Sequence, residues 1–169
     1  MPLMVIAQPI ATARLDLLPL SVSHAEEMAV VLADPALHTY IGGAPDSLAS
    51  LRSRYQRMTA GSPDPAVSWL NWVIRLRDSG LVGTVQATVR DAVAEIAWVV
   101  GTPWQGRGIA TEAARGLVDW LDQQPVDAII AHIHPEHRAS AGVAAAVGLV
   151  ATDEQQDGEI RWCRTRQTR

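Results

Sequence analysis

The sequence contains no lysine, no phenylalanine and only one cysteine. All 14 of its basic residues are therefore arginines, and the chain has no ε-amine of its own that could be modified. The single cysteine, Cys163, excludes an internal disulfide, which is typical of proteins from a reducing cytosol. We therefore expect a protein that works in the cytoplasm.

Long hydrophobic runs and a surplus of positive charge are missing as well. No apolar run approaches the roughly 20 residues of a membrane-spanning helix, and the N-terminus lacks the basic and apolar regions of a signal peptide. The 14 basic residues stand against 18 acidic ones, for a net charge of −4. No broad basic surface is then available for nucleic acid or anionic membranes, and we expect neither as a partner.

The composition that is present belongs to a globular protein. Of the residues, 48% are hydrophobic and 19% are charged, which argues against disorder. A chain of 169 residues is long enough to bury a core of its own. Because there is no internal repeat, low-complexity tract or linker, we expect one domain over residues 1–169.

Hydrophobic periodicity predicts strands and helices along the whole chain. Ser23 and Glu26 have the spacing of a capping box and predict the start of a helix. The predicted elements are a strand over residues 11–19, helices over 23–33 and 47–61, strands over 69–77, 81–90 and 93–100, a helix over 110–123, a strand over 127–135, a helix over 139–148, and strands over 149–155 and 159–164. The order β-α-α-β-β-β-α-β-α-β-β predicts an α/β (α+β) fold, with a mixed central sheet of about seven strands and flanking helices.

The stretch W-Q-G-R-G-I-A-T-E-A, residues 104–113, lies between a predicted strand and a predicted helix. A helix N-terminus binds phosphate readily, and Gly106 and Gly108 would let the backbone approach an anion closely. Arg107 adds a charged donor. The stretch is too short for a P-loop, and it is not the G-x-G-x-x-G pattern of dinucleotide-binding domains. By itself it is equally compatible with a tight turn.

The wider context of this stretch resembles a known family. Q-G-R-G-I-A, residues 105–110, fits the Q/R-x-x-G-x-G/A acyl-CoA signature of the GCN5-related N-acetyltransferase (GNAT) superfamily. A-E-I-A-W-V-V before it resembles the RimJ/RimL-type branch, which acetylates protein N-termini, ribosomal proteins and small amines. T-A-R-L-D-L-L-P-L resembles that branch's first strand, and H-P-E-H-R-A-S-A-G-V-A-A-A-V-G-L its last conserved helix region. The resemblance covers nearly the whole chain.

The resemblance implies a fold in which two neighbouring parallel strands splay apart and acetyl-CoA enters the gap. The pantetheine arm would pair with the strand backbone at Trp98, Val99 and Val100. The pyrophosphate would lie on the backbone amides of the glycine loop, with a hydroxyl donor at its end. These loop residues are Gln105, Gly106, Arg107, Gly108, Ile109, Ala110 and Thr111.

The resemblance also implies catalytic groups. Glu95 stands on the strand where many family members carry a carboxylate that takes the proton of the amine, often through water. Its alternation with Ala97 and Val99 places these three residues on one face of the strand. The backbone amide near Val100 would stabilise the oxyanion. The alternative for Glu95 is a solvated position on an exposed strand face.

The stretch H-P-E-H-R-A-S resembles the family's N-x-x-S element, with His137 in place of the usual Asn. Both positions would contact the pantetheine arm, and Ser140 would donate a proton to the leaving thiolate. Many members use a tyrosine a few residues later for that step, but residues 148–151 contain none. The alternative for Ser140 is an N-cap of the short helix that follows.

Three further side-chain types allow alternatives. The pattern of His132, His134 and His137 allows a metal site, although we expect no metal because no further ligand has suitable spacing. Cys163 could be a nucleophile or, with no paired His at recognisable spacing, a packed strand residue. Trp72 and Trp104 could line an acceptor pocket or belong to the core.

Taken together, the sequence predicts an N-acetyltransferase that moves an acetyl group from acetyl-CoA to a primary amine by direct attack in a ternary complex. The acceptor would be a small-molecule amine or a protein N-terminus, with a weak preference for a cationic one because the chain is acidic. We expect its pocket between the first two helices, their connection over residues 38–45 and the last hairpin. A homodimer is expected by analogy with the family. The alternatives are an inactive acyl-CoA-binding regulator and a small metal-binding protein.

Overall fold

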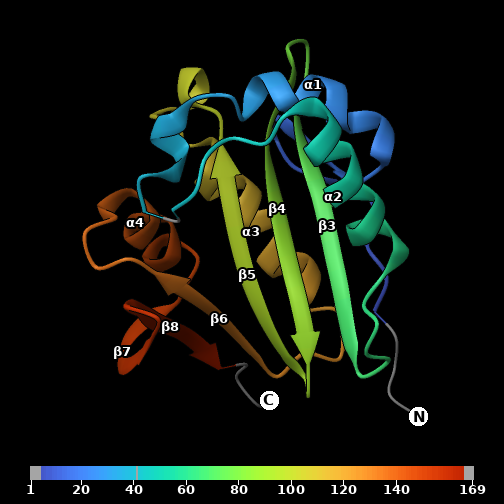
Figure 1. Cartoon of the computed structure of the whole chain (residues 1–169). Coiled ribbons are helices and arrows are strands. Elements are labelled where there is room, and N and C mark those ends of the chain that lie inside the picture. Colours follow the sequence, from blue (N-terminus) through green and yellow to red (C-terminus); the bar gives the residue numbers. More distant parts are fainter. Residues whose placement is uncertain (1–4, 41, 166–169) are drawn as a thin grey trace.

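The chain forms an eight-stranded mixed sheet with helices on both of its faces (Figure 1). The computed structural model describes residues 5–40 and 42–165, so the ends of the predicted domain 1–169 lie outside the described residues. The strands are β1 (Ile10–Ala11), β2 (Leu15–Pro19), β3 (Val67–Leu76), β4 (Gly80–Arg90), β5 (Val93–Val100), β6 (Ala128–Ile133), β7 (Val150–Gln156) and β8 (Glu159–Thr165). The helices are α1 (Ala25–Val31), α2 (Leu48–Ala60), α3 (Ile109–Leu121) and α4 (Arg138–Ala146), with short 3₁₀ turns at Val22–His24, Pro35–His38 and Thr102–Trp104.

The predicted fold class and element order are confirmed, with one strand more than expected. The sheet has the order β1-β2-β3-β4-β5-β6-β8-β7. Its extra strand, β1, has two residues that pair with β2, too few to produce a hydrophobic period. All neighbours are antiparallel except β5 and β6, which α3 connects as a parallel crossover. None of the helices in the described part of the chain is long and apolar enough to cross a bilayer.

Two hydrophobic clusters hold the helices to the sheet. The larger lies between the sheet and α3, where Ala113, Leu117 and Leu121 are fully buried because they recur every four residues along one side of the helix. The smaller lies under α1 and α2, where Met28 and Tyr55 pack over the sheet. The β-sheet is therefore covered on one face by α3 and, on the other, by α1 and α2 over only part of its area (Figure 1).

The predicted capping box at Ser23 and Glu26 is wrong. The chain first makes the 3₁₀ turn Val22–His24, and this turn is capped by Ser21, whose Oγ accepts from the amide of Ser23. His24 Nδ1 accepts from the Ser21 amide in return, at 3.0 Å. The sequence pattern did not show the turn because a single 3₁₀ turn has no hydrophobic period.

The parallel pairing of β5 and β6 is short. It covers only three residue pairs and ends at Glu95 and Ile130, although β5 continues to Val100 and β6 stays paired with β8 as far as Ile133. Figure 1 shows the two strands diverging from that point. The splay that the family resemblance implies is therefore present.

At the far end of β5, the backbone of β4 lies unusually close. A Cβ on Gly83 would overlap the carbonyl oxygen of Val99, which cannot move without shifting the strand. Gly142 in α4 is the matched case, because a Cβ there meets nothing within 4 Å. Position 83 therefore has no room for a side chain, whereas position 142 has.

We predict that Gly83→Ala lowers the free energy of unfolding by about 1–3 kcal/mol, because strand β5 must shift to accommodate the methyl group. Gly142→Ala should instead raise it by about 0.5–1 kcal/mol, since alanine loses less backbone entropy in a helix. Urea unfolding of both variants and the wild type measures this. Equal effects of the two substitutions would contradict the close approach of β4 and β5.

Candidate functional site

A cavity of about 590 Å³ lies where β5 and β6 separate. One side is formed by the end of β5, the glycine loop, the start of α3, the end of β6 and α4. The opposite side is formed by α1, α2 and their connection. Glu159 of the last hairpin also lines the cavity, next to Ile160, which pairs with Ile133 at the end of β6. The segments predicted for the acceptor pocket therefore line the same cavity as the predicted acyl-CoA residues; within the connection 38–45, residue 41 lies outside the described residues.

The glycine loop presents a row of free backbone amides at the start of α3. No acceptor on the described residues pairs with the amides of residues 106–111. Gly106 and Gly108 both have positive φ angles, +78° and +75°, which turn successive amides toward one side. Because α3 has 13 residues, its N-terminus adds the positive end of a helix dipole. Free donors and a dipole together favour an anion such as phosphate.

The side chains of this loop serve its structure. Gln105 Nε2 donates to the Val100 carbonyl at 2.9 Å and fastens the loop to the end of β5. Gly106, Gly108, Ile109, Ala110 and Thr111 line the cavity together with Gln105, but Arg107 does not. The Arg107 side chain is exposed, so the expected charged donor lies outside the cavity wall in this structure.

Arg14, just before β2, also stabilises the glycine loop. The sequence did not predict this contact. Arg14 Nη1 donates to the Arg107 carbonyl at 3.0 Å, and its Nε pairs with Glu112 at 2.7 Å. Burial alone would raise the pKa of Glu112, but hydrogen bonds from Thr12 and Arg14 outweigh it and lower that pKa. The carboxylate therefore stays charged and ties the β1–β2 turn to the first turn of α3.

The end of β5 leaves backbone groups unpaired toward β6. The Gly101 amide donates to Val82 of β4 at 2.8 Å. Alternate residues of a strand direct their backbone groups to the same side, so Val99 also faces β4, while Trp98 and Val100 face the gap. The gap is thus lined by amide and carbonyl groups with the spacing of a strand edge.

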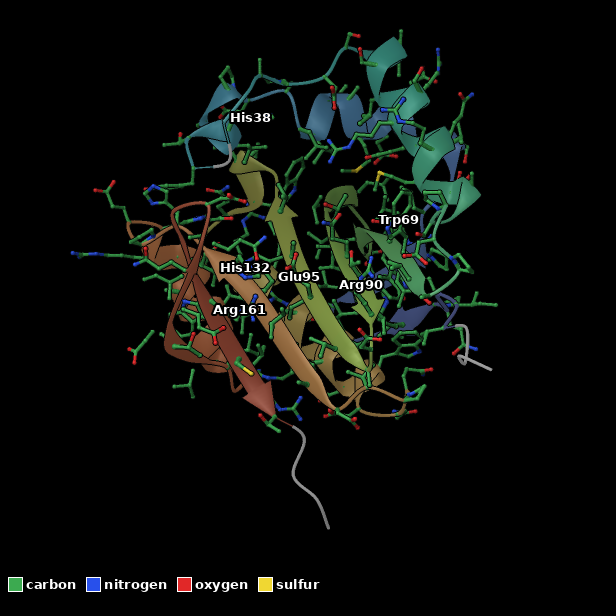
Figure 2. All side chains as sticks on the ribbon, turned by 60° about the horizontal axis from the view of Figure 1, so that its bottom comes forward. His38, Trp69, Arg90, Glu95, His132 and Arg161 are labelled. Carbon is green, nitrogen blue, oxygen red and sulfur yellow. The ribbon has the colours of Figure 1, made fainter. Side chains whose placement is uncertain are left out.

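Glu95 lies at the apex of the gap, in the last residue pair of the β5–β6 ladder. Its Oε1 is 2.8 Å from Nδ1 of His132, a side chain that is only 9% exposed, whereas Glu95 is 48% exposed. Arg161 of β8 donates to the other nitrogen of His132. Figure 2 shows the three labelled side chains on the adjacent strands β5, β6 and β8. His132 lines the cavity and Glu95 lies just outside its wall.

His137 and Ser140 come together at the start of α4. Ser140 Oγ lies 3.4 Å from His137 Nε2, and both residues line the cavity. The alternative interpretation of Ser140 as an N-cap is wrong, because the N-cap of α4 is His137 and Ser140 lies within the helix. Tyr40 stacks on the His137 ring, with 4.4 Å between ring centroids and 14° between planes.

The metal alternative requires the three histidines to converge, and they do not. In the part of the chain that the structure describes, no group of three or more His, Cys, Asp or Glu side chains is placed to hold a metal ion. His132 is engaged by Glu95 and Arg161, and His134 Nδ1 accepts from the amide of Glu136. Cys163 lies on β8 opposite Ile130.

Comparison with known proteins decides the family. The model of the acetyltransferase (GNAT) domain family matches residues 14–150. The chain belongs to the GNAT acetyltransferase family. A search of curated protein sequences gives no significant match.

Solved GNAT structures share the fold at low sequence identity. RimL, the ribosomal L7/L12 alpha-N-protein acetyltransferase solved with coenzyme A, has a TM-score of 0.77 and 15% identity, covering 94% of this chain and 98% of that one. Spermidine N-acetyltransferase from Vibrio cholerae, solved with coenzyme A and spermine, has a TM-score of 0.74 and 16% identity, and the match covers 91% of this chain and 96% of that one. An aminoglycoside acetyltransferase solved with coenzyme A has a TM-score of 0.74 and 18% identity, and the match covers 90% of this chain and 95% of that one.

Within this GNAT fold, the cavity includes Tyr40, which no sequence pattern indicated, and the two tryptophans for which the sequence allowed a place in an acceptor pocket. Tyr40 comes from the connection between α1 and α2 and meets His137 from α4, almost a hundred positions later in the chain. Trp72 and Trp104 both line the cavity, although Trp72 is fully buried and donates through Nε1 to the Gln8 carbonyl. No sequence pattern could have joined these residues, because they meet only through the tertiary fold.

The environment of His137 predicts a pH dependence of stability. Burial, and secondly the neighbouring His134, lower the pKa of His137 below its ordinary 6.5. The unfolded chain therefore takes up this proton at a higher pH than the folded chain does. The free energy of unfolding should fall as the pH drops from about 6.5 toward the lowered value, and this ring should have no effect above that window.

Urea unfolding at about pH 5.5, 6.5 and 7.5 tests this in the wild type and in His137→Asn. The variant should lose less stability between pH 6.5 and 5.5, because the unfolded chain no longer gains the proton. His24, whose pKa burial also lowers, contributes equally to both proteins and serves as the internal reference. The same loss in both proteins would refute the assignment to His137.

Proposed function

We propose that this protein transfers an acetyl group from acetyl-CoA to the primary amine of a protein N-terminus or a small molecule. The observation that carries the proposal is the gap between β5 and β6. It has free loop amides at one end, unpaired strand backbone along one side and a carboxylate at its apex. Membership of the GNAT family supports the same donor.

The residues at the gap fit coenzyme A. Its pyrophosphate would accept from the amides of residues 106–111, and its pantetheine arm would pair with the backbone of Trp98 as an added strand. The Val100 carbonyl already accepts from Gln105, so only the Val100 amide is left to face the cofactor. A Cβ at Gly106 would meet nothing within 4 Å, so the loop is open on the side of that glycine. His137 and Ser140 line the same wall. The bound cofactor supplies the acetyl thioester that the reaction consumes.

The chain's own groups supply the rest of the chemistry. Glu95 takes a proton from the acceptor amine, directly or through water, so that the nitrogen lone pair can form the bond to the acetyl carbon. The Val100 amide, which faces the gap, donates to the thioester oxygen as negative charge develops there. As the carbon–sulfur bond breaks, its electron pair goes to sulfur, and Ser140 passes a proton to the thiolate while it takes one up from solvent. Glu95 returns the proton of the amine to solvent, so the protons balance.

The carboxylates of the cavity favour a cationic amine as acceptor. Two carboxylates line the cavity, Asp46 before α2 and Glu159 from the last hairpin. Arg54 lies 3.4 Å from Asp46 and partly neutralises it. The three relatives named above act on a protein N-terminus, a polyamine and an aminoglycoside. These three classes of amine are therefore the acceptors to test first.

The experiment that tests the function is a thiol-release screen of the purified protein with acetyl-CoA against N-terminal peptides, polyamines and aminoglycosides. Acceptor-dependent release of coenzyme A, with a matching gain of 42 Da on the acceptor, is expected for at least one class (about one acetyl group per thiol released). Saturable acetyl-CoA binding without release across the panel would instead favour the inactive acyl-CoA-binding regulator.

Once the screen has identified an acceptor amine, we predict that Glu95→Gln lowers kcat for it by about 10²–10⁴-fold, because the proton acceptor is lost. Acetyl-CoA binding should stay within about twofold of the wild type, since Glu95 lies outside the cavity wall. Glu26→Gln, which changes an exposed carboxylate on α1, is the matched control and should leave kcat unchanged. Unchanged turnover in the Glu95 variant would refute its role.

We further predict that Gly106→Ala weakens acetyl-CoA binding at least tenfold, measured by calorimetry. The added methyl group strains a residue with φ +78° and disturbs the free amides. Gly158→Ala in the β7–β8 turn is the matched control, because it has φ +82° and equally open surroundings. Both variants should lose a similar stability of about 1–2 kcal/mol, but only the Gly106 variant should lose affinity. Equal affinities would contradict the phosphate site.

A further inference from the structure

A row of three polar side chains crosses the sheet where β5 and β6 part (Figure 2). Glu95 Oε1 lies 2.8 Å from His132 Nδ1, and Arg161 Nε donates to His132 Nε2 at 3.2 Å. Arg161 Nη1 is paired in turn with Glu154 at 3.0 Å. Since His132 and Arg161 are also opposite each other in the β6–β8 ladder, the backbone itself sets their separation.

The arginine determines which nitrogen of His132 carries the proton. A guanidinium nitrogen can only donate, and arginine stays protonated in proteins, so Nε2 of His132 must be the acceptor. The single N–H of the neutral imidazole is then on Nδ1, where it donates to Glu95. A charged imidazole would place a second N–H on Nε2, facing that of Arg161. The hydrogen bonds therefore place the N–H that faces Glu95 on Nδ1 of His132.

We infer that His132 and Arg161 are positioning residues for Glu95, an inference that rests on the proposed acetyl transfer. His132 holds Oε1, whereas Oε2 has no hydrogen-bond partner among the described residues and is left to receive the proton of the amine. In that step the proton moves to Oε2, and the electron pair stays on nitrogen to form the bond to the acetyl carbon. Because Arg161 occupies Nε2, the proton stays on the carboxyl group until solvent removes it.

The need for positioning follows from the exposure of Glu95. With 48% of its side chain exposed, an unrestrained glutamate on an open sheet face would sample several rotamers, and most would point away from the cavity. The His132 ring is held by two hydrogen bonds, is nearly buried and forms part of the cavity wall. It therefore gives Glu95 a fixed attachment on the side where the substrates would meet.

The test is a double-mutant cycle in which His132→Leu and His132→Asn are each combined with Glu95→Gln. His132→Leu should lower kcat at least tenfold with the KM for acetyl-CoA unchanged, because the donor to Glu95 is lost. His132→Asn should stay within about threefold of the wild type, since its amide nitrogen lies near the place of Nδ1. In the Glu95→Gln background, neither change should lower kcat by more than about twofold, because residues that act through one another are not additive.

Two results would overturn the inference. The first is a His132→Asn variant as slow as His132→Leu. The second is a full loss from His132→Leu that persists in the Glu95→Gln background, which would show that His132 acts independently of Glu95. Thermal unfolding of each variant, run beside the kinetics, identifies any loss of rate that comes from loss of fold.

The position of the His132 proton can also be measured in the wild type, which tests the inference even if a variant fails to fold. Nitrogen-15 NMR of the histidine rings at about pH 7 should show the proton of His132 on Nδ1, with His132→Asn used to assign the signal. A proton on Nε2 would overturn the arrangement. The acetyl transfer of the wild type, measured first, tests the proposed function alone: a wild type that acetylates no amine but has the Nδ1 proton would refute the function and leave the geometry in place.

Discussion

The structure depends on the point at which backbone pairing between β5 and β6 stops. Beyond Glu95 and Ile130, the two strands share no further residue pair, although each continues and stays paired on its other side. Backbone groups in an interior must find partners, so a gap of this kind is stable only if something satisfies them. One is satisfied within the chain, where Gln105 donates to the Val100 carbonyl. The others form an edge that an extended ligand can pair with.

The surrounding elements keep this gap open and give its two ends different chemistry. At the wide end, Arg14 and Glu112 fasten the glycine loop, so that its amides are arranged for an anion before any ligand arrives. At the narrow end, where the backbone pairing of β5 and β6 stops, the two strands are still joined by a side-chain contact between Glu95 and His132. The free loop amides and the Glu95 carboxylate therefore lie at opposite ends of the same gap.

His137, the position that departs from the family pattern, makes contacts of its own with Tyr40 and Ser140. The resemblance implies an Asn where His137 stands, and the structure shows the imidazole stacked on Tyr40, with its Nε2 3.4 Å from Ser140 Oγ. Burial keeps the pKa of the ring low, so at neutral pH it is uncharged and can donate or accept one hydrogen bond in place of the amide. Through its contact with Tyr40, His137 also joins the α1–α2 connection to the start of α4.

The sequence by itself determined the element order, the fold class and the glycine loop, because hydrophobic period and the needs of a tight turn before a helix are local properties. It also placed Glu95, Ala97 and Val99 on one face of the strand, in agreement with the burial pattern of β5. It missed the two-residue strand β1 and misplaced the first cap, since such short elements have no period. Only the tertiary structure decided that Arg107 is exposed and does not line the cavity, and that Tyr40 meets His137. It likewise brought Arg161 to His132 and, through it, to Glu95. Those contacts join residues far apart in the chain, and their geometry comes from strand register and core packing, which no local pattern contains.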